Sequence, residues 1–188
     1  MNSSGMKFAF VVWLMWAFSV LVTGGIVTRH TNIKCEIHDQ SFAEVKVCRL
    51  KVLGRGIIGA NVHLHILSLP IKTTLINFSV FKKMSGYHPF LFNITADLCH
   101  YMKHPNPSNV FFYFYRALTP YINVNHTCPI NYFSKQHDVI LKDFVLDDKM
   151  FSIVPAPVGS YMFLIKLIAN GALRATIYSY LDINVDKP

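Results

Sequence analysis

Hydrophobic and polar residues alternate along most of the chain after residue 25, with the two-residue period of β-strands that bury one face. Turn-forming residues separate the alternating segments. In the second segment the phase changes by one residue after Val47, as it does at a β-bulge. The predicted strands are 33–52 with a polar break at 38–41, then 61–66, 73–84, 139–146, 161–168 and 173–185.

The alternation also predicts which strand residues face the core. Segment 161–168 is apolar on both faces apart from Lys166, which is typical of a central strand. In 73–84, Asn77 and Ser79 are assigned to solvent. In 173–185, Arg174 and Asp182 are assigned to solvent. The expected buried residues are Thr74, Ile76, Phe78 and Val80 in the first of these strands and Leu173, Ala175, Ile177, Leu181 and Ile183 in the second.

The segment Asp97–Tyr121 is the one place where helices are predicted. A short helix over 96–103 ends before the Pro-Asn-Pro sequence at 105–107, and Asp97 is a candidate cap. Ser108 is the expected N-cap of a second helix over 109–118, with Phe111, Phe112, Tyr115 and Leu118 along one side. We therefore predict a mainly β protein, an antiparallel two-sheet β-sandwich of the immunoglobulin-like kind with one or two short helices.

The N-terminal 25 residues resemble a signal peptide. Lys7 precedes the apolar segment 8–22, and small residues follow at Thr23-Gly24-Gly25. The apolar segment is shorter than the roughly 20 residues of a membrane anchor, so cleavage is the favoured interpretation. The mature protein, residues 26–188, is then one secreted, extracellular domain with no stable membrane insertion. The net charge is +8 for the full chain and +7 once Lys7 is removed, and it does not indicate a nucleic-acid partner, because the compartment excludes one.

Cysteines and glycosylation sequons agree with secretion. The four cysteines allow three connectivities, and we favour Cys35–Cys48 with Cys99–Cys128 because each pair closes a local loop. Three N-x-[ST] sequons follow the signal segment, at Asn77, Asn93 and Asn125.

No motif of the sequence predicts an enzyme, a cofactor or a metal. The G-x-G-x-x-G at 54–59 is followed by a strand pattern, whereas a dinucleotide site requires a helix there, so we interpret it as a turn. His63 and His65 share the polar face of a strand, but the sequence identifies no third ligand nearby. Solvent-facing histidines are the simpler interpretation.

Several motifs together resemble a large insect family of small secreted proteins catalogued as domain of unknown function 1091, which includes the CheB proteins of chemosensory bristles. They are Lys34-Cys35, Cys48-Arg49-Leu50-Lys51, Gly86-Tyr87-His88-Pro89-Phe90-Leu91, Asp97-Leu98-Cys99, Asn125-His126-Thr127-Cys128-Pro129 and Pro155-x-Pro157-x-Gly159-x-Tyr161. That family looks like a distant relative of the ML lipid-recognition superfamily. The resemblance implies a β-sandwich that holds an apolar ligand between its sheets.

The residues alone leave two functions open. The aromatic segment 111–115 either closes an apolar cavity or fills a solid core. In the first case the protein carries a lipid or another small hydrophobic molecule, for which the resemblance to the CheB proteins implies a role in chemosensation. In the second it recognises a receptor or another partner through its surface. The expected pocket lining is Val62, Leu64, Ile66, Ile76, Phe78, Val80, Phe111, Phe112, Phe114, Phe163 and Ile165.

Secretion and glycosylation give a first testable prediction. Expressed in insect cells, the protein should appear in the medium without residues 1–25, and its mass should fall on glycosidase treatment. Intact-mass spectrometry of the secreted product measures both effects. A product that stays in membranes with residues 8–22 attached contradicts the prediction.

Overall fold

The computed structural model describes residues 26–124, 138–151 and 156–185. These residues form strands β1 to β8, two short α-helices and one turn of 3₁₀-helix. Their bounds are β1 Ile26–Ile37, β2 Ala43–Gly54, β3 Ile57–Ile66, β4 Thr74–Lys83, β5 Tyr87–Asp97, α2 Leu98–Lys103, α3 Val110–Leu118, β6 Asp138–Val145, η1 Asp148–Phe151, β7 Gly159–Ala169 and β8 Ala172–Val185.

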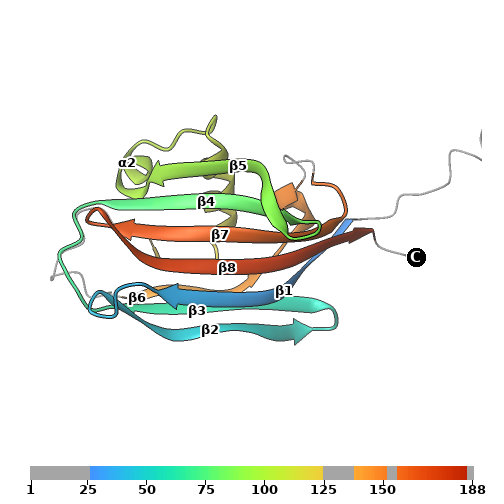
Figure 1. The fold of residues 1–188 in the computed structure, drawn as a ribbon, viewed down its shortest axis with the longest axis horizontal. Helices are drawn as coiled ribbons and strands as arrows, with labels where there is room; N and C mark the ends of the chain where they lie inside the picture. Colours follow the sequence, from blue (N-terminus) through green and yellow to red (C-terminus); the bar gives the residue numbers. More distant parts are fainter. Residues whose placement is uncertain (1–25, 125–137, 152–155, 186–188) are drawn as a thin grey trace, which may run out of the picture.

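The strands form two antiparallel sheets that face each other (Figure 1). One sheet has five strands in the order β1-β8-β7-β4-β5, and the other has three in the order β2-β3-β6. The predicted antiparallel β-sandwich with two short helices is therefore confirmed. The expected central strand is also confirmed, because β7 pairs with β4 on one side and β8 on the other.

A disulfide joins the two sheets along one edge. Cys35 lies on β1 and Cys48 on β2, and their bond confirms the first predicted pairing. The strands β1 and β2 are the edge strands of their sheets on this side. Cys99 is also disulfide-bonded. Its predicted partner, Cys128, lies outside the described residues.

At the opposite edge the helical segment connects the two sheets. The chain leaves edge strand β5, forms α2 and α3, and then runs beside edge strand β6 (Figure 1). The backbone N–H of Lys142 donates to the carbonyl of Tyr121 over 2.9 Å, and that of Asn123 donates to Ile140 over 3.1 Å. The Asn123 side chain also accepts from the backbone N–H of Ile140 at 2.8 Å. The helices thus span the side where β5 and β6 do not pair.

The helix caps confirm one predicted residue and correct another. Asp97 caps α2, since its carboxylate accepts from the backbone N–H of His100 at 2.9 Å. The prediction of Ser108 as the second cap is wrong by one residue. Asn109 caps α3 by accepting from the Phe111 N–H at 2.9 Å. The backbone N–H of Ser108 instead donates to the Asn106 side chain, in the turn before the helix.

The Gly-rich motif forms the β2–β3 hairpin turn, as predicted. Gly56 has φ of 76°, a left-handed conformation that glycine adopts at little steric cost. The predicted bulge in β2 is also present, as a register shift between Val45 and Val47. The sequence therefore located the turn and one of the two register shifts of this hairpin, whereas it did not predict the shift between Val52 and Gly54.

At the start of β8, the predicted burial of Leu173 and the predicted exposure of Arg174 are both wrong. Leu173 is 39% exposed, whereas Arg174 is half-buried and stacks 4.7 Å from the ring centre of Phe42. A shift in the β7–β8 register between Leu167 and Ile168 changes which face these residues occupy. The Arg174 guanidinium also donates to the Asp39 carboxylate, which holds it against the sheet. From Ala175 onward the predicted buried residues Leu181 and Ile183 are buried.

The edge disulfide gives the second prediction. The two cysteines are 13 residues apart, and closing such a loop stabilises the folded state by about 3 kcal/mol. We expect the double variant Cys35→Ala/Cys48→Ala to lose about that much unfolding free energy in urea titrations. Non-reducing peptide mapping should show Cys99 still oxidised in this variant. A loss below about 1 kcal/mol would show that the sheets do not depend on this bond.

Candidate functional site

An apolar cavity of about 360 Å³ lies between the two sheets. Strands of both sheets, α2, α3 and η1 all contribute side chains to its wall. The principal ones are Ala60, Val62, Leu64 and Ile66 of β3, Ile76 and Phe78 of β4, Phe111, Phe114, Tyr115 and Leu118 of α3, Val139, Leu141 and Phe144 of β6, Phe163, Ile165 and Leu167 of β7, and Ile177 of β8.

Strand alternation explains how the sheets form this wall. In β3 the even-numbered residues from Ala60 to Ile66 are buried and line the cavity, while His63 and His65 point to the other face. In β4, Ile76 and Phe78 do the same from the opposite sheet. The two inner faces therefore meet the cavity with branched and aromatic side chains.

Most of the predicted lining residues lie on the cavity wall. Val80 instead lines a smaller pocket of about 10 Å³ beside it, and Phe112 lines neither space. Helix geometry explains why Phe112 does not reach the cavity. Positions 111, 114, 115 and 118 share one face of the helix, and position 112 is turned about 100° away from position 111. The predicted residues found on the cavity wall are Val62, Leu64, Ile66, Ile76, Phe78, Phe111, Phe114, Phe163 and Ile165.

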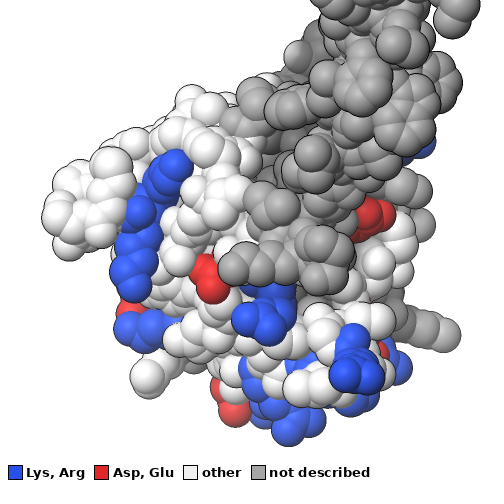
Figure 2. All heavy atoms as spheres, turned by 90° about the vertical axis from the view of Figure 1, so that its right-hand side faces the viewer, with Lys and Arg blue, Asp and Glu red and all other residues white. Residues whose placement is uncertain are grey.

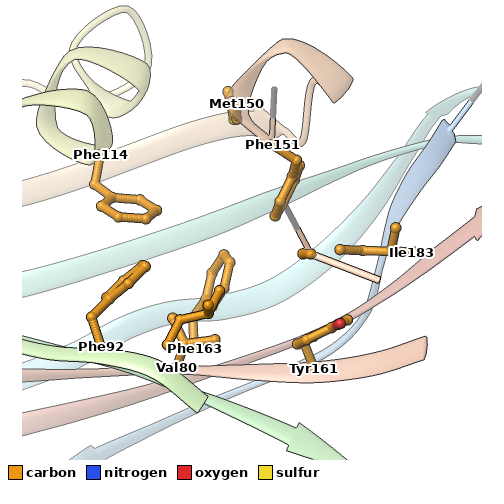
Figure 3. A pocket seen from close by; sticks show the side chains of 10 residues that line it. Val80, Phe92, Phe114, Met150, Phe151, Tyr161, Phe163 and Ile183 are labelled. Atoms are coloured by element: carbon orange, nitrogen blue, oxygen red, sulfur yellow. The ribbon is translucent and has the colours of Figure 1, made fainter. Parts of the chain in front are cut away.

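Aromatic rings close the side of the cavity near η1. Figure 3 shows the smaller pocket, with Phe114 of α3 and Phe151 of η1 facing the rings of the five-stranded sheet. The ring centres of Phe78 and Phe114 are 4.3 Å apart, and those of Phe78 and Phe163 are 5.3 Å apart. Such tilted pairs stabilise packing beyond the area they bury. Helix α3 is held against the sheet by these contacts.

Sequence reasoning missed part of the wall. Phe42, next to β2, and Phe144 of β6 line the cavity, as do Met150 and Phe151 of η1. The alternation of β6 was a usable signal for its residues, because it predicted the strand. Nothing in the sequence predicted that η1 would fold back against the five-stranded sheet, since that contact depends on long-range packing.

Few polar groups reach the cavity wall. The hydroxyl of Tyr115 donates to the carbonyl of Val124 at 3.0 Å. Asp138 contributes to the wall, but its carboxylate lies 2.5 Å from His65 Nδ1 and 3.0 Å from His63 Nε2. Hydrogen bonds from these two histidines lower the pKa of Asp138. A molecule in the cavity would therefore meet mainly hydrocarbon.

The Asp138 carboxylate also bears on whether His63 and His65 could bind a metal ion. The sequence identified no third potential ligand near His63 and His65, and the structure brings Asp138 to both. Even so, among the described residues no group of three or more His, Cys, Asp or Glu side chains is arranged to hold a metal ion.

Two of the predicted glycosylation sequons lie side by side on the outer face of the five-stranded sheet. The Asn77 amide donates to Asn93 Oδ1 at 2.7 Å and to Thr95 Oγ1 at 2.9 Å. The assignment of Ser79 to solvent is wrong, because the flanking strands β5 and β7 bury it. Asn93 is exposed on edge strand β5. The third sequon, at Asn125, lies outside the described residues.

His30 is a buried titratable group beside the cavity. It is 1% exposed, and its Nδ1 lies 3.3 Å from the hydroxyl of Ser179, which lines the cavity. Its ring packs edge-on against Phe144 at 5.6 Å. Burial lowers the pKa of His30 to about 4, against a smaller opposing contribution from the backbone of Phe144. Neutral His30 is therefore part of the folded core.

This pKa predicts a specific loss of stability in acid. The unfolded chain binds a proton near pH 6.5, whereas folded His30 stays neutral until about pH 4, so stability falls as the pH drops through that window. We expect His30 to account for a loss of about 2 kcal/mol between about pH 7 and about pH 5. Urea titrations at both pH values measure it. The variant His30→Leu should lack this component, and an unchanged pH dependence in that variant would contradict the assignment.

Among the helices in the described part of the chain, none has the length and hydrophobicity to cross a bilayer.

Comparison with known sequences relates the chain to a protein family. No curated protein matches the chain. A family model described as "Protein of unknown function (DUF1091)" matches residues 76–163, from β4 through the helical segment to the start of β7. This match supports the assignment of the chain to the DUF1091 family.

Proposed function

We propose that this protein is a secreted, non-enzymatic binding protein that holds a lipid chain or another small hydrophobic molecule between its sheets. The observation that carries the proposal is the apolar cavity of about 360 Å³. Binding sites for small molecules commonly occupy about 300–1,000 Å³ and are lined mainly by hydrophobic and aromatic side chains. The cavity has that size and that lining.

The chemistry of the wall supports an apolar ligand. Removing apolar ligand surface from water contributes about 25 cal/mol per Å², and the loss of ligand freedom opposes it. A long acyl chain then reaches roughly micromolar affinity. A charged headgroup has no partner deep in the wall, so it would remain outside the cavity.

Two adaptable side chains suit a ligand of variable shape. Met102 of α2 and Met150 of η1 line the cavity together with the aromatic residues of α3. Methionine is flexible and polarisable, so it packs against irregular ligands. Both lie in the helical segments rather than in the sheets, which leaves the sandwich itself as a rigid frame.

Further features support secretion, glycosylation and the class of ligand. A disulfide between the sheets suits an oxidising compartment, which supports secretion. The exposed amide of Asn93 supports glycosylation at that sequon. The resemblance to CheB proteins and to the ML superfamily suggests lipids or hydrophobic chemical signals as ligand classes.

Filling the cavity gives the decisive test. Ala117 and Arg116 are neighbours on α3, but Ala117 lines the cavity whereas Arg116 is exposed. We expect Ala117→Trp to weaken binding of a fluorescent fatty acid to the delipidated protein by at least about tenfold, because the indole occupies ligand space. Arg116→Trp adds the same side chain outside the cavity and should change binding by less than about twofold.

Circular dichroism and urea titration establish that both variants fold. Phe78→Arg provides a second test, because an arginine in the wall cannot be solvated there and should also lower binding. If the folded wild type takes up neither fluorescent fatty acids nor long-chain hydrocarbons, the carrier function is wrong. Equal affinities in the Ala117→Trp and Arg116→Trp variants would place the ligand elsewhere.

A further inference from the structure

Exposed apolar side chains gather at one end of the sandwich. The β2–β3 and β4–β5 hairpins both lie at the right-hand end in Figure 1, together with the start of β1 and the end of β8. Val52 is 73% exposed and Ile57 48% exposed in the first hairpin, and Leu53 is also exposed. In the second hairpin Met84 is 65% exposed. Exposed apolar side chains that form a contiguous patch commonly mark a site of interaction with a protein or a membrane.

Cations surround the apolar residues of the first hairpin. Arg49, Lys51 and Arg55 are all exposed. Lys51 has one distant carboxylate, Asp143, at 3.9 Å. No carboxylate of the described residues forms an ion pair with Arg49 or Arg55. Figure 2 looks onto this end, and Lys and Arg side chains gather along its lower edge, where the three-stranded sheet lies. We call Val52, Leu53 and Ile57, with these three cations, the basic tip.

We propose that the basic tip docks the protein on membranes that contain anionic lipids. Apolar side chains flanked by Lys and Arg suit a bilayer interface, because the apolar groups enter the acyl boundary while the cations meet the headgroups. A second copy of the chain is the poorer occupant. Two such tips brought together would oppose cations with cations, whereas an anionic surface complements them.

The expected strength follows from the charges. Each Lys or Arg near an anionic surface strengthens binding by about fivefold, so the three cations of the tip give roughly a hundredfold preference over neutral lipid. Salt screens this preference within about 10 Å at moderate ionic strength. Binding should therefore be peripheral, reversible and sensitive to salt. The inference stands independently of the cavity, because none of the tip residues lines it.

Vesicle co-sedimentation of the secreted, glycosylated protein tests the proposal. We expect it to sediment with phosphatidylcholine vesicles that contain phosphatidylserine, and to do so much less with phosphatidylcholine alone or at high salt. Val52→Asp/Ile57→Asp should reduce binding by at least about tenfold, and Arg49→Gln/Arg55→Gln by roughly twenty-five-fold. Leu67→Asp is the matched control, because Leu67 is 51% exposed beyond β3, at the opposite end of that strand from the tip.

Each outcome decides the proposal. Loss in both tip variants with retention in the Leu67→Asp control supports docking through the tip. Equal binding to both vesicle types, or equal loss in the control, overturns it. A wild-type dimer in light scattering that the tip variants convert to monomer assigns the tip to a second copy instead. Fatty-acid uptake, measured on the same variants, should stay unchanged and separates this test from that of the cavity.

Discussion

The two edges of the sandwich are held in different ways, and the cavity depends on this difference. At one edge the Cys35–Cys48 bond joins the sheets directly. At the other, β5 and β6 do not pair, and α2 and α3 span the gap (Figure 1). Sheets that pack face to face at about 10 Å interdigitate their side chains and leave a solid core. Here the ring of Phe114 on α3 packs against Phe78 and Phe92 of the five-stranded sheet, so a helix occupies the place of a second sheet edge.

The edge strands of both sheets carry backbone groups that could pair with other chains, so they need protection from such pairing. On β2, an outward row that includes Lys46, Arg49 and Lys51 supplies like charges that oppose edge-to-edge association. On β5, Asn93 is exposed and Pro89 removes one backbone donor. A glycan at Asn93 would add bulk on the outer face of this strand. Protection of the sheets therefore comes from charge on one side and from a missing backbone donor on the other.

The sequence predicted most of the strands because two-residue alternation is a local property, but it missed edge strand β5, Tyr87–Asp97, and the first half of β1. The bulge in β2 and the turn at Gly56 were also predictable, since each leaves a mark in a few neighbouring residues. Other errors occurred where long-range packing decides. Arg174 is half-buried because Phe42 and Asp39, far away in sequence, lie against it. For the same reason the sequence could not decide between a cavity and a solid core. Phe78 and Phe114 would be the same aromatic residues in either case, and only the placement of α3 decides between the two.

A cavity of this size has an energetic consequence. Side chains around an apolar void lose packing contacts, so the folded state is less stable with the cavity of about 360 Å³ empty than with it filled. The edge disulfide offsets about 3 kcal/mol by restricting the unfolded chain. An apolar ligand would restore the missing contacts, and ligand that binds only the folded state raises stability with its concentration. If a ligand binds there, occupancy and folding of this protein are linked, and the filled protein is the more stable one.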